Sequence, residues 1–107
     1  MKIINIANDF SSAPAGRFPE DGPFNGTTFR EHFLVPALSD GAELTIDLEG
    51  VSGFGSSFLE EAFGGLVRIN HFDKNDLLTR IKVIFKDPAL VFYADSITDF
   101  ITEAAQE

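Results

Sequence analysis

The sequence predicts a small layered α/β domain, built on a mixed, mainly parallel sheet of three to four strands with about three helices. Three segments have strand-like apolar patterns, and a segment with apolar residues at helical spacing follows each of them. Strands and helices that alternate in this way are typical of parallel strands joined by right-handed crossovers. The length of 107 residues and the hydrophobic content of 44% suit a single domain over residues 1–107.

The N-terminal part is expected to hold a strand, a long connector and a helix. Lys2–Ala7 contains three Ile, which is typical of a strand. Residues 8–26 are rich in Pro and Gly and contain three Phe, so we expect a connector that packs against the core. A helix should follow, since Thr28 and Glu31 fit a capping box. Its apolar positions recur at helical spacing: Phe29, Phe33, Leu34, Ala37 and Leu38.

The middle of the chain is expected to contain a strand, a Gly-rich turn and a second helix. Ala42–Leu48 alternates apolar and polar residues, as a half-buried strand does. A turn over 49–55 leads to the helix, with Ser56 or Ser57 as its N-cap. The adjacent Gly64 and Gly65 indicate that another element approaches this helix closely, because glycine is otherwise costly in a helix.

The C-terminal part is expected to contain a strand and a third helix. Asp73–Leu78 is polar and is interpreted as a connector to a strand at Arg80–Phe85. Asp87 should cap the last helix, with Pro88 at its first position. Its apolar positions are Leu90, Tyr93 or Ala94, Ile97, Ile101 and Ala104.

The composition excludes several classes of protein. Without Cys, the chain has no disulfide framework and no Cys-based metal site. Eight basic and 17 acidic residues give a net charge of −9, which disfavours binding to nucleic acid or to anionic membranes. No apolar run approaches the roughly 20 residues of a membrane helix, and the first apolar stretch is too short for a signal peptide. We therefore expect a cytoplasmic protein.

The Gly-rich turn is the most informative segment for function. It enters a helix whose N-terminus offers free backbone N–H groups. A phosphate-binding Walker loop needs a Lys that is absent here, and neither Ser56 nor Ser57 has the second Gly of a hydrolase nucleophile elbow. The structural interpretation is a tight turn with a Ser cap. The functional interpretation is an exposed hydroxyl that accepts phosphate.

Other polar residues give weaker signals. His32 and His71 are expected on the surface or at a helix end, so we expect neither a metal site nor a bound cofactor. Glu60 and Glu61 are expected to point away from the core. For Arg17 we expect pairing with acidic groups, and contact with an anion is the alternative.

The segment TIDLEGVSGFGSSFLEEAFGGLV resembles the core of a STAS domain, the fold of bacterial anti-sigma factor antagonists. In that family a strand ends in Asp-Leu, a turn follows, and an Asp-Ser-Ser-Gly motif opens a helix. Here Asp47-Leu48 ends the strand and Gly55-Ser56-Ser57-Phe58 occupies the motif. The whole chain is similar to a STAS-like bacterial family of unassigned function, most specifically through its Ser-Ser-Phe-Leu block.

This resemblance implies a non-enzymatic regulatory module that binds a protein. Ser56 would be the phosphoacceptor, with Ser57 as the alternative, and a histidine-kinase-like ATPase would be both kinase and partner. The partner-binding loop and helix would comprise Gly53, Phe54, Gly55, Phe58, Glu60 and Glu61. Two hypotheses from other classes stay open. One is a small enzyme or a small-anion or nucleotide-binding domain that uses the same helix N-terminus and Arg17. The other is a homodimer formed through a Phe-rich surface.

Overall fold

The strands form one parallel sheet in the computed structural model, which describes residues 2–105. The sheet has the order β1 (Lys2–Asn5), β2 (Leu44–Asp47), β3 (Ile81–Ile84), and both pairings are parallel. In this register Ile4 lies beside Ile46, and Ile46 lies beside Val83. The predicted α/β class with parallel strands is confirmed.

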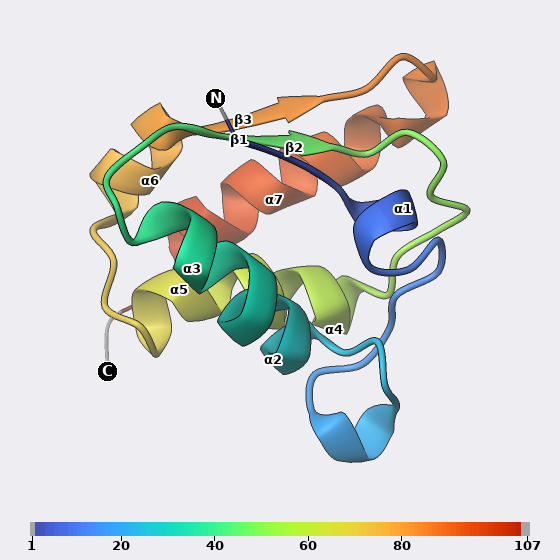
Figure 1. Cartoon of the computed structure of the whole chain (residues 1–107), viewed down its shortest axis with the longest axis horizontal. Helices are drawn as coiled ribbons and strands as arrows, with labels where there is room; N and C mark the ends of the chain where they lie inside the picture. The colour runs from blue at the N-terminus through green and yellow to red at the C-terminus, as the bar shows by residue number, and fades with distance from the viewer. Residues whose placement is uncertain (1, 106–107) are drawn as a thin grey trace.

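The helices that connect and follow the strands lie on one side of the sheet (Figure 1). The inward side chains of the strands, among them Leu44 and Ile46, are fully buried against these helices. The opposite face of the sheet carries the exposed side chains Ile3, Lys82 and Ile84. The core therefore lies between the sheet and a single layer of helices.

The first long helical segment runs through α2 (Gly26–Phe29), a π-helical turn (Arg30–Leu34) and α3 (Val35–Leu38). The predicted apolar stripe is confirmed, because Phe29, Leu34 and Leu38 are buried. The predicted capping box is wrong. Asn25 is the N-cap, and its side-chain oxygen accepts a hydrogen bond from the backbone N–H of Thr28 at 2.9 Å. Glu31 instead pairs with the neighbouring Arg30.

The second helical segment comprises α4 (Ser56–Leu59), a π-helical turn (Glu60–Gly64) and α5 (Gly65–Arg68). The close approach expected at its glycine pair is present. A methyl group on Gly65 would collide with the guanidinium group of Arg30, which reaches across from the first helical segment. Glycine at this position therefore makes room for a buried ion pair between the two helical segments.

Two short α-helices and a 3₁₀ turn (Pro19–Asp21) lie where no helix was expected. The helix α6 (Lys74–Arg80) replaces the predicted polar connector. Asp73 caps it by accepting from the backbone N–H of Asp76 at 2.9 Å, and Leu77 is its buried anchor. One buried Leu in a short polar segment gives too little periodicity to indicate a helix. The helix α1 (Ile6–Asp9) likewise follows β1, where a continuing strand was predicted.

The last helix forms as predicted. A 3₁₀ turn (Pro88–Leu90) leads into α7 (Val91–Glu103), and the Asp87 carboxylate accepts from the backbone N–H of Ala89 at 3.0 Å. Ile97 and Ile101 are buried in the core. No helix in the described part of the chain is long and apolar enough to cross a membrane.

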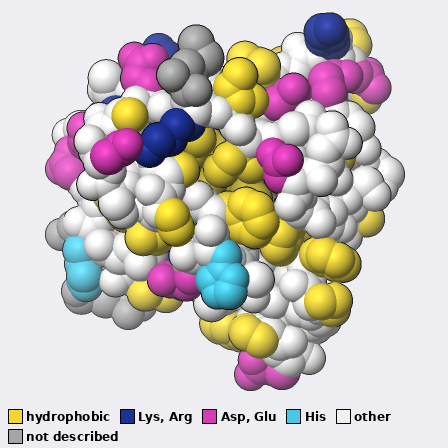
Figure 2. All heavy atoms as spheres, in the orientation of Figure 1, with side chains coloured by type: hydrophobic (Ala, Val, Ile, Leu, Met, Phe, Trp, Pro, Cys, Tyr) yellow, Lys and Arg dark blue, Asp and Glu magenta, His cyan; other side chains and the backbone are white. Residues whose placement is uncertain are grey.

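The long connector packs down only in part. Its Phe10 ring lies 5.0 Å from Phe29 and 5.4 Å from Phe24, measured between ring centroids. Phe18 and Phe24 nevertheless keep 44% and 45% of their surfaces exposed. Figure 2 shows hydrophobic side chains gathered in the middle of one face, with acidic side chains scattered around its edge.

Candidate functional site

The Gly-rich turn lies between β2 and α4 and is held by the connector. Ser52 donates its backbone N–H to the Ser12 carbonyl at 2.8 Å, and the backbone N–H of Gly55 lies 3.4 Å from the Pro14 carbonyl. Gly50 has a φ of +90°, a conformation that favours glycine. The connector thus backs the turn along its length and fixes where α4 begins.

Both candidate phosphoacceptors are exposed at the start of α4. Ser56 and Ser57 are its first two helical residues, and the extended residue Gly55 is the N-cap, without a side-chain capping bond. The expectation that a serine caps this helix is therefore wrong. The physical reason is that the extended backbone ends one residue earlier, so both hydroxyl groups lie within the first turn.

The two phenylalanines predicted for the docking loop have different environments. Phe58 is fully buried and stacks on Phe54, with a centroid distance of 5.9 Å, and it also packs against Phe29. Phe58 is thus a core residue, and its predicted place on a partner-binding surface is wrong. Phe54 is half-buried, and Tyr93 packs against it edge-on at 5.0 Å. Phe54 and Gly53 stay accessible beside the turn.

The prediction that Glu60 and Glu61 point into solvent is wrong. The Glu60 carboxylate lies 2.5 Å from Arg17 and 2.5 Å from Arg68. Glu61 is buried and pairs with Arg30 at 2.8 Å, and the side chains of both residues are only 3% exposed. Helical spacing places these glutamates outside the apolar stripe, but it does not show which arginines from other segments reach them.

This ion-pair network changes the titration of its members. Burial, the largest single contribution, raises the pKa of Glu60, but hydrogen bonds from Arg68 and Arg17 outweigh it. The net result is a pKa below the usual value for glutamate. The pKa of Arg17 is raised, chiefly by its hydrogen bond to Glu60. The positive charge of Arg17, the predicted anion contact, is therefore engaged by a carboxylate.

The two histidines lie on the surface, as predicted. His32 and His71 are both exposed, and His71 has a φ of 61°, at the end of the second helical segment. Among residues 2–105, no group of three or more His, Asp or Glu side chains is placed to hold a metal ion.

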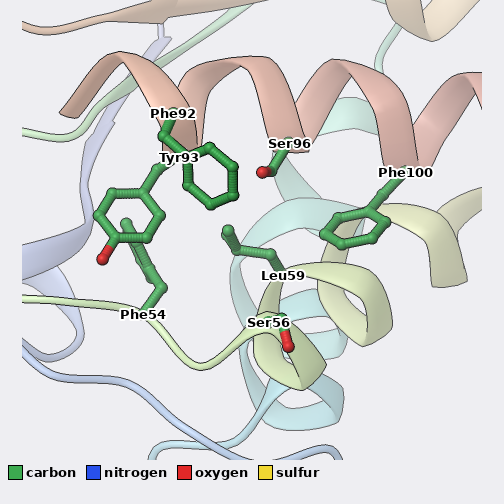
Figure 3. A pocket seen from close by; sticks show the side chains of 7 residues that line it. All are labelled: Phe54, Ser56, Leu59, Phe92, Tyr93, Ser96 and Phe100. Atoms are coloured by element: carbon green, nitrogen blue, oxygen red, sulfur yellow. The ribbon is translucent and has the colours of Figure 1, made fainter.

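A small pocket beside Ser56 was not found from the sequence. It has a volume of about 120 Å³ and lies between the α4 segment and α7 (Figure 3). The aromatic residues Phe92, Tyr93 and Phe100 lie on its α7 side. The sequence held one signal for this pocket. These aromatic residues form a second apolar strip along α7, beside its buried stripe.

A parallel sheet whose central strand leads through a Gly-rich turn to a Ser-Ser helix start defines a STAS-like α/β domain. Residues 25–88 match the family described as STAS-like domain of unknown function (DUF4325), and the chain belongs to this family. The match confirms the family resemblance read from the Ser-Ser-Phe-Leu block. Comparisons with the curated proteins and with the solved structures give no match.

Proposed function

We propose that this chain is a non-enzymatic regulatory module that binds a protein partner through residues 49–57, and that phosphorylation of a serine switches binding. The observation that supports this proposal is the pair of exposed hydroxyl groups, Ser56 and Ser57, at the start of α4. Anti-sigma factor antagonists, which the chain resembles, carry their phosphoacceptor at this place. By the same resemblance, the proposed partner and kinase is a histidine-kinase-like ATPase.

The electrostatics at the start of α4 suit such a switch. The first turn of a helix tolerates a phosphate, because the free backbone N–H groups and the helix dipole favour negative charge there. We propose Ser56 as the acceptor, because it borders the pocket as well as the turn. A phosphate there would change the charge of the docking surface without disturbing the buried Phe58.

The alternative, a small enzyme or an anion-binding domain at the same helix N-terminus, has less support. The side chain predicted to contact the anion, the Arg17 guanidinium, already pairs with Glu60 and with Glu61. Phosphate or nucleotide bound at α4 would have to compete with these carboxylates. A rise in melting temperature with phosphates or nucleotides would nevertheless favour this alternative.

The test uses the tagged full chain to capture its partner from native cells, with intact-mass analysis of the recovered chain. We expect a histidine-kinase-like ATPase and a phosphate that maps to Ser56. The affinity of the purified ATPase is then measured for Ser56→Ala and Ser56→Asp, with Ser57→Ala as the matched control. The alanine variants should bind like the parent and Ser56→Asp should bind more weakly. Equal affinities of Ser56→Ala and Ser56→Asp would remove the switch.

A further inference from the structure

The pocket beside Ser56 is walled mainly by apolar groups. Phe54 and Leu59 line it from the turn and α4, and α7 contributes three aromatic side chains: Phe92, Tyr93 and Phe100. Figure 3 shows the side chains of α7 and of the α4 segment directed toward one another across it, with Ser96 among the rings. Ser56 lies at the edge, and its hydroxyl points away from the Leu59 side chain. The polar groups among the lining residues are the hydroxyls of these two serines and of Tyr93, and none of the lining side chains is charged.

The size of the pocket limits what it can accommodate. Sites for drug-sized ligands and cofactors usually measure roughly 300 Å³ or more. An apolar cavity of roughly 150 Å³ accommodates a benzene molecule. At about 120 Å³, this pocket suits one apolar side chain, such as Leu, Ile, Met or part of a Phe ring.

The surface around the pocket continues the apolar area outward. Phe92 is 69% exposed and Val91 is 47% exposed, and both precede the buried part of α7. Large apolar side chains exposed beside a pocket are typical of surfaces that bind proteins. An incoming segment could therefore bury Phe92 while it inserts its own side chain into the pocket.

The charge beside the pocket is acidic. Asp95 follows Phe92 by three residues and Asp99 follows Ser96 by three residues, so each lies next to a pocket residue on the surface of α7. Both carboxylates are exposed, and α7 contains neither Lys nor Arg. On the side of the α4 segment, Arg17 and Arg68 both pair with Glu60. The carboxylates of Asp95 and Asp99 would therefore attract a segment that carries basic residues across α7.

We infer that the pocket between α4 and α7 is the anchor point for a basic amphipathic segment of the protein partner. One apolar side chain of that segment enters the pocket, its neighbouring apolar surface covers Phe92, and Lys or Arg residues lie beside Asp95 and Asp99. This inference rests on the proposed function and specifies the chemistry of the partner. A phosphate on Ser56, at the edge of the pocket, would alter how the segment binds there.

The test is a selection of random linear peptides on the full chain, followed by affinity measurements on three variants. Ser96→Phe fills the pocket, and Phe92→Ala removes its exposed wall. Thr98→Phe is the matched control, because Thr98 is exposed on the same helix and does not line the pocket. Phe92→Ala decides the result if Ser96→Phe fails to fold, since so exposed a side chain adds little to the core.

We expect the enriched peptides to carry a net positive charge and at least one large apolar residue. Their affinity should fall about tenfold or more on Ser96→Phe and Phe92→Ala, stay unchanged on Thr98→Phe, and weaken as salt is raised. Neutral or acidic peptides, equal affinity for all variants, or no enriched peptide would each overturn the inference.

The two proposals fail in different ways. If the partner binds Ser56→Ala and Ser56→Asp equally but loses affinity on Phe92→Ala, the anchor is supported and the switch is removed. If the partner distinguishes Ser56→Asp but binds Phe92→Ala like the parent, the switch is supported and the anchor is overturned.

Discussion

At the scale of single residues, Glu60 and Glu61 are paired with arginines that are distant in sequence, and the Glu61–Arg30 pair is buried. Glu60 pairs with Arg17, which precedes it by 43 residues, and Glu61 pairs with Arg30, which precedes it by 31. Removing one member of a buried pair leaves an uncompensated charge, which costs more than a surface ion pair gains. The network therefore ties the connector and the first helical segment to the α4 segment. It also gives the two glutamates a structural role, although they lie next to the proposed docking surface.

The lowered pKa of Glu60 predicts how stability depends on pH. A carboxylate whose folded-state pKa lies below its unfolded value of about 4.3 stabilises the fold above that pH and loses this effect as the pH falls through the folded-state pKa. Glu60→Gln should therefore unfold more easily than the parent at pH 7, by about 1 kcal/mol, and the difference should shrink toward pH 3. Urea unfolding at both pH values measures it.

The matched control is Glu20→Gln, which changes an exposed glutamate in the connector. This variant should follow the parent curve at both pH values. A Glu60→Gln chain whose deficit stays the same from pH 7 to pH 3 would show that the carboxylate charge is not the stabilising feature.

At the scale of the elements, the helix starts show which local signals decide. Asn25, Asp73 and Asp87 each accept a hydrogen bond from a backbone N–H in the turn that follows. Only the cap at Asp87 was predicted, because Pro after a capping residue is a strong and local signal. At the first helical segment, the Thr28–Glu31 pattern predicted a different cap. Asn25 is the N-cap because its backbone is extended and the helix begins at the next residue.

Two substitutions test whether Asn25 or Thr28 caps the first helical segment. Asn25→Ala should lower the free energy of unfolding by about 1–2 kcal/mol, because it removes the bond to the Thr28 N–H and that to the Gly22 carbonyl. Thr28→Ala should have a smaller effect, since it leaves the cap intact. Chemical denaturation of both variants against the parent is the measurement. A larger loss for Thr28→Ala would restore the capping box.

At the scale of the whole molecule, one core connects the sheet with the helices. The buried apolar residues form a single cluster that includes Ile4 in β1, Phe63 in the second helical segment and Ile101 in α7. The Phe rings of the connector and the α4 segment extend it toward the turn, through Phe10 and Phe58. The proposed docking surface is therefore built directly on the core.

A shared core predicts one cooperative unfolding transition for the single domain. Helix content followed by far-ultraviolet circular dichroism and the fluorescence of Tyr93 should give the same denaturant midpoint. Tyr93 reports on the pocket, since it packs against Phe54. An earlier midpoint for Tyr93 would show that α7 separates from the sheet before the core unfolds. Sedimentation at two concentrations tests the homodimer hypothesis on the same samples.

Local patterns in the sequence predict the class of the fold, the strands, the helices with long apolar stripes and the place of the Ser-Ser helix start. Each of these depends on local periodicity or on a short motif, so neighbouring residues carry the information. The glycine pair even indicated the close contact that Gly65 makes with Arg30. The sequence pattern did not predict α1 and α6, because their few buried residues show no helical periodicity.

Which side chains are available for function depends on the folded arrangement. The tertiary structure assigned Phe58, Glu60 and Glu61 to packing and ion pairs, left Ser56 and Ser57 exposed, and brought α7 against the turn to form the pocket. These outcomes depend on contacts between segments tens of residues apart. The physical reason is that burial and pairing belong to the folded arrangement, whereas a pattern in the sequence describes only one element at a time.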